Sequence, residues 1–258
     1  MLMNARKNQQ GFAHWILILI VFAAIGAVGF IVATRGNNDK GSNVAMTEAS
    51  ETTDPEANLE ISNFGLSSVK NDLNISNDAL RDYESSGLKG FYVFGDKLSG
   101  NRLNPNFEFA SVKEGVDVIS AIDGIVAFIK QQESGDYEVY LQPKENSIWT
   151  IGYDHLTDLK VKKGDSIKIG AKLGVPAKQG NGQLRFEFQV NKDVDGQTTH
   201  VCPSTLLAAS AKDTQLAGLA SMQDSWETVS GKALYDQALQ KPTGCISHTL
   251  TPQQAEGR

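Results

Sequence analysis

The histidines and cysteines are the side chains of this sequence with the most chemistry to offer. The chain holds four histidines and two cysteines. His200 and Cys202 stand two positions apart, and together with His155 they would supply three zinc ligands if the fold brought them together. A disulfide between Cys202 and Cys245 would instead remove the thiolate and would suit an oxidising compartment. The residues alone leave both possibilities open, as well as a pair of buried thiols.

Short strands separated by glycine turns are predicted to position these residues, between Phe107 and Leu207. Apolar and polar residues alternate in residues 116–121, 137–141 and 184–190, as in half-buried strands. Strands of this length and spacing are typical of an all-β sandwich or barrel. The fold class predicted for this region is therefore mainly β.

An internal repeat runs through the same region. One copy begins at Val112-Lys-Glu-Gly115 and the other at Val161-Lys-Lys-Gly164. In each copy a strand, a glycine turn and a second strand follow, and glycine suits such corners because it takes positive φ without steric cost. Two copies of one β unit can pack face to face, so that each covers the apolar side of the other.

An apolar segment near the amino terminus predicts a membrane anchor. No charged residue occurs between Lys7 and Arg35, and residues 15–34 are almost wholly apolar. As a helix they would rise about 30 Å, roughly the thickness of the hydrocarbon core of a bilayer. The apolar run is long for a signal peptide, and its exit, residues 31–35, makes a poor cleavage site. We predict a single-pass plasma-membrane protein with residues 1–14 in the cytoplasm, although the positive charges on the two sides barely decide the orientation.

The rest of the chain divides by composition. The expected segments are a disordered tether (35–60), a mixed lead-in (61–103), the β domain (104–207) and a helical C-terminal extension (208–258). Helices are predicted within Asn74–Tyr83, Asp213–Val229 and Lys232–Gln240. The net charge is −6, and no basic stripe with interleaved aromatic residues occurs, which excludes a nucleic-acid partner.

Four segments in the β region carry a resemblance to a known family. They are residues 115–124, ending in Asp-Gly; Tyr153-Asp-His-Leu156; residues 161–174, the second repeat copy; and Leu184-Arg-Phe-Glu-Phe188. Their order and spacing resemble the M23 (LytM/lysostaphin-like) zinc peptidases, a family with a duplicated hybrid, or barrel-sandwich, β fold. The family cuts peptidoglycan cross-links, so the resemblance implies a role in the cell envelope.

The metal site that this resemblance implies is degenerate in the sequence. The family takes its zinc ligands from a His-x-x-x-Asp pair and from the second histidine of His-x-His. Here the His-x-His positions hold Gln183 and Arg185, and the upstream stretch has no histidine, although Glu108 can replace the aspartate. A guanidinium has no lone pair to donate and repels a cation. Of the family's histidines only His155 remains, so no catalytic residue and no metal ligand is assigned.

The function predicted from the resemblance is a pseudoenzyme that binds peptidoglycan or regulates a cell-wall enzyme. Its expected partners are the membrane and peptidoglycan or a cell-wall hydrolase, without a cofactor. The ligand groove would be lined by residues on the sheet: Tyr153, His155, Gln183, Arg185 and Glu187. Arg185 would pair with Glu108 or meet a peptide carboxylate. Two alternatives stay open: an active zinc endopeptidase with an altered site, and an envelope adaptor with a lipoyl-like domain, as in membrane-fusion proteins.

Overall fold

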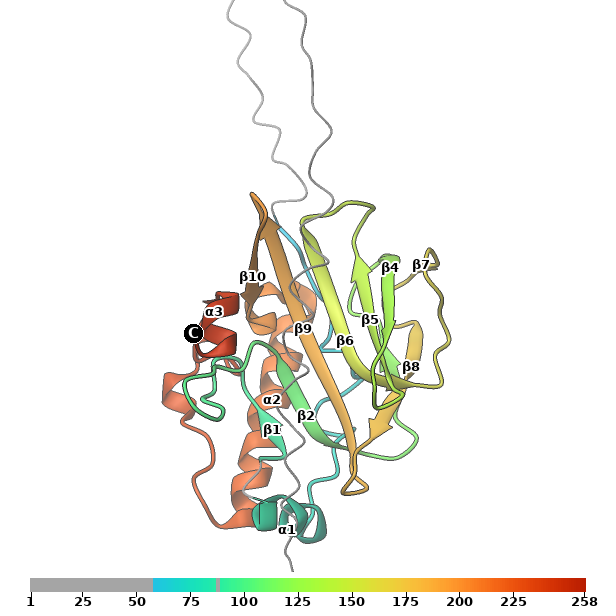
Figure 1. The fold of residues 1–258 in the computed structure, drawn as a ribbon. Coiled ribbons are helices and arrows are strands. Elements are labelled where there is room, and N and C mark those ends of the chain that lie inside the picture. Colours follow the sequence, from blue (N-terminus) through green and yellow to red (C-terminus); the bar gives the residue numbers. More distant parts are fainter. Residues whose placement is uncertain (1–57, 87–88) are drawn as a thin grey trace, which may run out of the picture. The chain divides into compact units, whose positions relative to one another are not determined.

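A mainly antiparallel sheet dominates the chain (Figure 1). The computed structural model describes residues 58–86 and 89–258, so the predicted cytoplasmic segment and membrane helix, and most of the tether, lie outside the described residues. Among the helices of the described ranges, none has both the length and the apolarity that crossing a bilayer requires. The strands are β1 (Phe91–Tyr92), β2 (Phe107–Val112), β3 (Val118–Ile119), β4 (Gly124–Gln131), β5 (Tyr137–Gln142), β6 (Trp149–Thr157), β7 (Ser166–Ile167), β8 (Lys172–Lys178), β9 (Leu184–Val194), β10 (Gln197–Val201) and β11 (Thr249–Leu250). The helices are α1 (Asn77–Ser86), α2 (Ala209–Ser230) and α3 (Pro252–Glu256), with short 3-10 turns η2 (Pro203–Leu206) and η3 (Gln237–Leu239).

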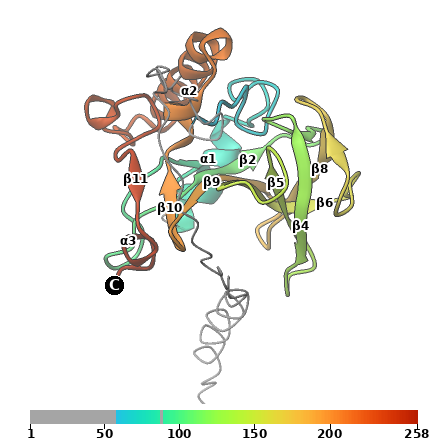
Figure 2. The ribbon, with the colours of Figure 1, turned by 90° about the horizontal axis from the view of Figure 1, so that it is seen from above.

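The long strand β9 joins the two parts of the sheet. It pairs with β2 and β10, and also with β6 and β8, so it lies between the β4–β5 region and the β10–β11 region (Figure 2). Along β9, Phe186, Phe188 and Val190 are buried, while Arg185 and Glu187 point to the other face. Successive side chains of a strand point to opposite faces, so this alternation separates an apolar core face from a polar face. The strands predicted at residues 137–141 and 184–190 are confirmed by β5 and β9.

The two repeat copies pair with each other reciprocally. The short strand of the first copy, β3, pairs with β8 of the second copy, and the short strand of the second copy, β7, pairs with β4 of the first. The predicted strand at residues 116–121 is thereby reduced to the two residues of β3. The chain between the copies forms β5 and β6, where a membrane-fusion protein would have a helical hairpin. This arrangement lets each copy complete the sheet of the other.

Aromatic side chains from the lead-in, the sheet and the tail fill the core. Phe64 packs edge-on against Phe107, and the Phe107 ring in turn contacts Phe91. Trp226 of α2 is fully buried, and a Cβ at Gly90 would lie 2.3 Å from its ring, so only glycine fits at this position. Burial of each such aromatic ring stabilises the fold by roughly 1.5–3 kcal/mol. The core therefore includes the lead-in and the tail, which the sequence had placed outside the β domain.

Two segment boundaries differ from those expected from composition. Leu59 is buried in the core, although the sequence had placed it in the tether that ends at residue 60. A single apolar side chain within a polar stretch gives no local sign that it will be covered. The predicted short helix near Asn74–Tyr83 is present as α1, displaced by three residues at each end.

The tail is anchored by one long helix and a disulfide. The helix predicted at Asp213–Val229 is confirmed by α2, which ends where Gly231 takes a left-handed φ of 65°. The helix predicted at Lys232–Gln240 is wrong, since only η3 forms there. The reason is that the side chain of Glu227 accepts the backbone N–H groups of Leu234 and Tyr235, both at 2.9 Å, which ties this stretch to α2 instead. Further along, Cys245 forms a disulfide with the cysteine that follows β10.

Candidate functional site

A row of carboxylates crosses four neighbouring strands on the polar face of the sheet. The register places Glu108 of β2 directly opposite Glu187 of β9, and Glu187 directly opposite Asp154 of β6. Glu138 extends the row onto β5, in the stretch where the register between β5 and β6 shifts. Like charges directly opposite each other destabilise a sheet. The row, defined by these four residues, therefore needs cations beside it.

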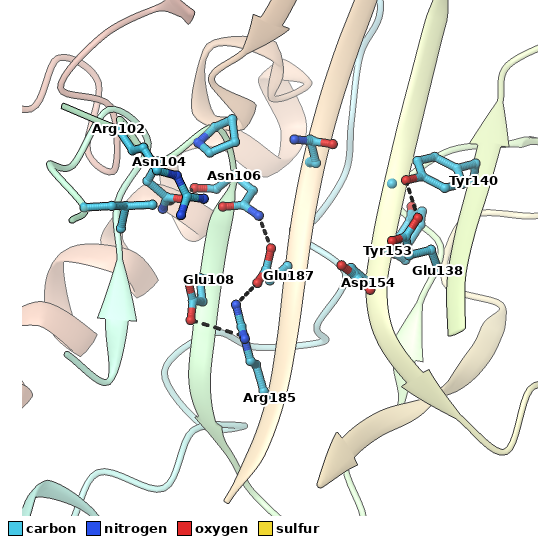
Figure 3. A pocket seen from close by; sticks show the side chains of 14 residues that line it. Arg102, Asn104, Asn106, Glu108, Glu138, Tyr140, Tyr153, Asp154, Arg185 and Glu187 are labelled. Atoms are coloured by element: carbon cyan, nitrogen blue, oxygen red, sulfur yellow. Dashed lines mark hydrogen bonds and ion pairs between the residues drawn. The ribbon is translucent and has the colours of Figure 1, made fainter. Parts of the chain in front are cut away.

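Arg185 of β9 supplies one of these cations (Figure 3). Its Nε lies 3.1 Å from Oε1 of Glu108, and its Nη2 donates a hydrogen bond to Glu187. Burial disfavours the charged guanidinium, but the negative charges of Glu187 and Glu108 outweigh it and raise the pKa of Arg185. Of the two partners expected for Arg185, the structure places Glu108 beside it. The guanidinium is thus held between two carboxylates.

His155 of β6 supplies the second cation. Its Nδ1 lies 2.6 Å from Oδ2 of Asp136, and its Nε2 lies 3.4 Å from Oε1 of Glu187 and 3.8 Å from Oδ2 of Asp154. Burial works against the charged imidazolium, yet the hydrogen bond to Glu187 and the charge of Asp154 raise the pKa of His155 to about 9. A left-handed φ of 61° at His155 coincides with the register shift of β6. At neutral pH the ring is therefore a cation bonded to carboxylates through both nitrogens.

The two cations do not neutralise the whole carboxylate row. Burial and the charge of Glu187 raise the pKa of Glu108 to about 7, although Arg185 and His155 act in the opposite direction. Burial also raises the pKa of Asp154 to about 6, with further contributions from Glu187 and Glu138 against the opposing charge of His155. Glu187 itself is held ionised, because its bonds to His155 and Arg185 outweigh its burial and lower its pKa. The row thus keeps carboxyl groups that readily take up a proton or another cation.

Two hollows adjoin Arg185. The smaller, of about 280 Å³, is lined by the four residues of the carboxylate row and, on the side of Glu108, by Arg102, Asn104 and Asn106 (Figure 3). The larger, of about 750 Å³, is lined by His155 and Asp136 together with loop residues that include Gly115 and Gly180. Arg185 lines both. The smaller hollow, called the acidic pocket below, and the larger one, called the open groove, therefore share this side chain.

Of the expected groove residues, the structure brings His155, Arg185 and Glu187 together, with Glu108 beside them. Gln183 lines neither hollow, since it stands where the turn before β9 ends, and its backbone carbonyl accepts the N–H of Gln179 at 2.8 Å. Tyr153 borders the acidic pocket, but its ring is buried in the core. Its hydroxyl accepts the backbone N–H of Ala121 at 2.8 Å, which makes it a structural residue.

The cysteine and the second histidine do not join His155. Cys202 is bonded to Cys245, and Nδ1 of His200 lies 2.8 Å from the side-chain oxygen of Asn191. The ligand set composed of His155, His200 and Cys202 is therefore wrong. Cys202 is fully buried, and its disulfide links the end of β10 to the tail.

Other residues of the site carried no sequence signal of their own. Asp136 lies in the turn between β4 and β5 and reaches His155 only because the hairpin folds back. Asn106 donates its amide to Glu187, and Tyr140 donates its hydroxyl to Glu138 at 2.7 Å. Asp154 alone could have been found, because it is the neighbour of His155 in the Tyr-x-His-Leu segment. The others depend on strand register.

The zinc ligands that the family resemblance implies do not form here. The two histidine positions hold Gln183 and Arg185, and Arg185 is bonded to Glu108, the residue expected in place of the aspartate. Because the guanidinium is itself a cation and has no lone pair, these residues do not fit a divalent ion at that position.

A different set of side chains forms a possible metal group. Asp136, Asp154 and His155 each offer one ligand atom, and these atoms lie within 4.8 Å of one another. Carboxylate and imidazole are donors that zinc accepts. The imidazole would first have to lose its proton, because only the neutral ring can donate to a metal. The residue types of this group therefore suit a metal, but in the structure His155 forms ion pairs with Asp136 and Asp154.

A comparison with known protein families agrees with the sequence motifs. The sequence model of a family described as Peptidase family M23 matches residues 108–198. No curated protein matches the chain. The described fold is similar to the catalytic domain of the prophage-encoded M23 protein EnpA from Enterococcus faecalis, with 21% identity over 44% of this chain and 88% of that chain and a TM-score of 0.35. The catalytic domain of lysostaphin from Staphylococcus simulans shares 20% identity over 40% of this chain and 76% of that chain, with a TM-score of 0.32.

A zinc-containing peptidase from Vibrio cholerae shares 24% identity over 40% of this chain and 32% of that chain, with a TM-score of 0.32. These structural likenesses are distant, so the similarity to the M23 family depends on the sequence match, which extends from β2 to β10. That match contains the carboxylate row, Arg185 and His155. Residues 108–198 of this chain are therefore similar in sequence to the M23 peptidase family.

Proposed function

We propose that this chain places an M23-type domain outside the cytoplasm, where its acidic pocket and open groove bind peptidoglycan or the domain regulates a cell-wall hydrolase, without cutting. The M23 family acts on peptidoglycan, which gives the class of ligand. The domain keeps the polar face and the two hollows in which a ligand can lie. At the two positions where the family has the histidines of His-x-His, this chain has Gln183 and Arg185.

One observation carries the absence of cutting in this proposal: the ion pair of Arg185 with Glu108 and Glu187. A hydrolytic zinc needs three protein ligands and an open position for water. Here a positive guanidinium lies among the side chains that would have to provide them. The positive charge of Arg185 opposes a divalent ion and also compensates Glu108 and Glu187. In this proposal the acidic pocket is therefore stable without a metal.

The proposed location rests on two features. The disulfide Cys202–Cys245 favours an oxidising compartment, since such bonds are rare where thiols are kept reduced. The apolar segment at residues 15–34 would serve as the anchor and residues 35–57 as its tether, which would keep the domain close to the membrane and beneath the cell wall.

Zinc analysis and a binding assay on the purified full-length chain test the proposal. We expect less than one zinc per ten chains and co-sedimentation with purified cell-wall sacculi. We also expect no release of peptide fragments from those sacculi over hours. Failure to sediment with sacculi contradicts the binding role, and chelator-sensitive release of fragments contradicts the absence of cutting.

The group of Asp136, Asp154 and His155 favours one alternative, an active hydrolase with a displaced metal. In that case cell-wall zymography with added zinc would show a clearing zone for the wild-type chain and none for the Asp136→Asn or His155→Gln variants. Arg185→Lys serves as the matched variant, since it keeps the positive charge without altering the three donors. We expect no clearing for any of these proteins.

A further inference from the structure

We propose that the acidic pocket binds a primary ammonium group of a peptide, such as a lysine-type side chain or a free amino terminus. This inference rests on the proposed function, because it names the chemical group by which a cell-wall peptide would be held. The proposal depends on the weakly paired carboxylates of the pocket, an unpartnered buried oxygen in its wall, and the open groove that shares Arg185 with it.

Charge is unevenly compensated along the carboxylate row. Arg185 serves the Glu108–Glu187 end, where it contacts both side chains. At the other end, Asp154 receives hydrogen bonds from the amide of Gln132 and from the backbone N–H of His155, the latter at 2.6 Å. These are neutral donors, and the nearest ring nitrogen of His155 is 3.8 Å away and engaged with other carboxylates. Among the described residues, Asp154 therefore has this long ion pair with His155 but no cation within hydrogen-bond distance.

Glu138, next along the row, has only a weak cationic partner. Nζ of Lys130 lies 3.4 Å from its Oε1, and Lys130 is nearly half exposed, so water screens this pair. Its other oxygen accepts the hydroxyl of Tyr140, which is neutral. Arg102, the remaining cation of the pocket wall, has its Nε 3.5 Å from the backbone oxygen of Ala255. The lining of the pocket thus holds four carboxylates and two guanidinium groups, with His155 and Lys130 just outside it. The carboxylates with the weakest cationic partners are Glu138 and Asp154.

Asn106 gives an independent sign of a missing hydrogen-bond donor. The residue is 7% exposed and lines the acidic pocket, and its amide nitrogen donates to Glu187. This bond fixes the orientation of the amide, because the reverse orientation would place two oxygens together. Its Oδ1 is then buried without a hydrogen-bond partner among the described residues. A buried acceptor of this kind costs about 1–3 kcal/mol unless a donor reaches it.

An ammonium group meets these requirements better than a metal ion does. It carries a positive charge and three N–H donors, and the surplus acceptors of the pocket are oxygens of carboxylate and amide groups. A metal would need the imidazole of His155, which is already bonded to Asp136 and Glu187. The raised pKa values of Glu108 and Asp154 agree with a site that accepts a cation.

The surroundings explain why the amine would belong to a peptide. The acidic pocket holds about 280 Å³, enough for an amine and a few methylene groups. Arg185 also lines the open groove of about 750 Å³, whose walls are formed partly by the glycine-containing loops at Gly115, Gly135 and Gly180. An extended backbone can lie in such a groove while its amine reaches into the pocket.

Calorimetric titration of the purified full-length chain in detergent tests the proposal with two matched probes. One is the peptide Ala-Lys-Ala with both ends blocked, and the other is the same peptide with its side-chain amine acetylated. We expect the amine peptide to bind about tenfold to a hundredfold more tightly, because a hydrogen bond to a charged group contributes that much. Equal affinity of the two peptides, or no binding of either, would overturn the inference.

Variants then locate the binding. Asp154→Asn and Glu138→Gln keep the shape of each side chain while removing its charge, and each should weaken the amine peptide about tenfold without changing the acetylated one. Glu145→Gln, at an exposed acid in the β5–β6 loop, is the control and should bind like the wild type. Unchanged affinity in both pocket variants counts against the site, and so does stoichiometric zinc binding that Asp154→Asn abolishes.

Sedimentation with cell-wall sacculi separates this inference from the function on which it rests. Sacculi that bind equally before and after chemical acetylation of their amines would overturn the ammonium site and leave the proposed binding role standing. Amine peptides that bind in the pocket while sacculi do not would overturn the role instead. The two measurements use the same protein preparation.

Discussion

The two faces of β9 contribute to the fold in different ways, one through apolar packing and the other through ion pairs. On the core face, Phe186 and Phe188 are fully buried among other aromatic rings. On the polar face, Arg185 and Glu187 alternate with them and bind charged groups from β2 and β6. An apolar side chain gains stability against any apolar neighbour, whereas a buried charge is stable only beside its partner. The core face should therefore respond to lost volume, and the polar face to lost partners.

The largest effect is expected from Phe186→Ala on the core face. The ring stacks on Phe109 and Tyr153, with centroids 6.0 and 6.3 Å away, so its loss leaves a cavity. We expect the free energy of unfolding to fall by about 3–5 kcal/mol, measured by urea denaturation. Phe128→Ala is the control, because that ring on β4 is 48% exposed, and it should cost less than about 1 kcal/mol. Equal costs at the two positions would contradict the comparison.

The next effect is expected from Arg185→Met on the polar face. Removing the guanidinium leaves Glu108 and Glu187 facing each other, and breaking a buried pair costs about 3–5 kcal/mol. Because the Arg185 side chain is 28% exposed, we expect a smaller loss of about 2–3 kcal/mol in urea denaturation at pH 8. The double variant with Glu108→Gln should recover part of it, since one of the two repelling charges is gone. A double variant that is less stable than Arg185→Met would rule out this account.

The dependence of stability on pH sharpens the comparison at His155. Its pKa is about 9 in the folded chain and about 6.5 when unfolded, so the folded state holds an extra proton between these values. This stabilisation is complete below pH 6.5 and is lost as the pH rises through 9, by roughly 3 kcal/mol. Urea denaturation at several pH values with a chelator present measures it. The slope should flatten in His155→Gln, and an unchanged slope would assign it to another group.

The raised pKa of Glu108, to about 7, acts in the same direction at lower pH. Between about pH 4.5 and 7 the folded chain holds a proton that the unfolded chain has lost, so stability falls as the pH rises. In Glu108→Gln this part of the slope should become shallower, and what remains below about pH 6 belongs to Asp154, whose pKa is also raised. The part above pH 7 should be unchanged.

The smallest effect is expected from Gln189→Ala, on the polar face of β9 but beyond the carboxylate row. Its side chain accepts one hydrogen bond from Asn191, at 3.3 Å. A partly exposed substitution of this kind should change the free energy of unfolding by less than about 0.5 kcal/mol. A cost similar to that of Arg185→Met would mean that the face as a whole, and not the charge row, is sensitive.

The elements of the sheet could be predicted wherever a strand has its own periodicity. The alternation in residues 184–190 identifies β9 because one face is covered by aromatic rings and the other is polar. Shorter strands were less clear: β3 and β7 have two residues each, and the repeat motif indicated them better than periodicity did. Helix α2 could be predicted because its apolar residues recur with helical periodicity. The conformation of the segment after Gly231 is instead set by hydrogen bonds of its backbone to the side chain of Glu227, which local propensity does not predict.

The candidate site was predictable only where the family motif extends to it. The motif indicated His155 and the replacement of a ligand by Arg185, and it suggested Glu108 with an uncertainty of one residue. It also suggested Gln183 and Tyr153, which the structure places at a turn and in the core. A motif assigns positions along the chain, but it does not tell which neighbour a changed side chain will meet.

Taken alone, the sequence determined the strand-rich class, the repeat, the long C-terminal helix and the loss of two histidines, because each of these is written in residues close together along the chain. Only the tertiary structure decided that Glu108, Glu138, Asp154 and Glu187 form one row, that Asp136 reaches His155, and that Cys202 meets Cys245. Those contacts join residues far apart in the chain through strand register. A shift of one residue would turn every side chain of a strand to the other face and abolish the row.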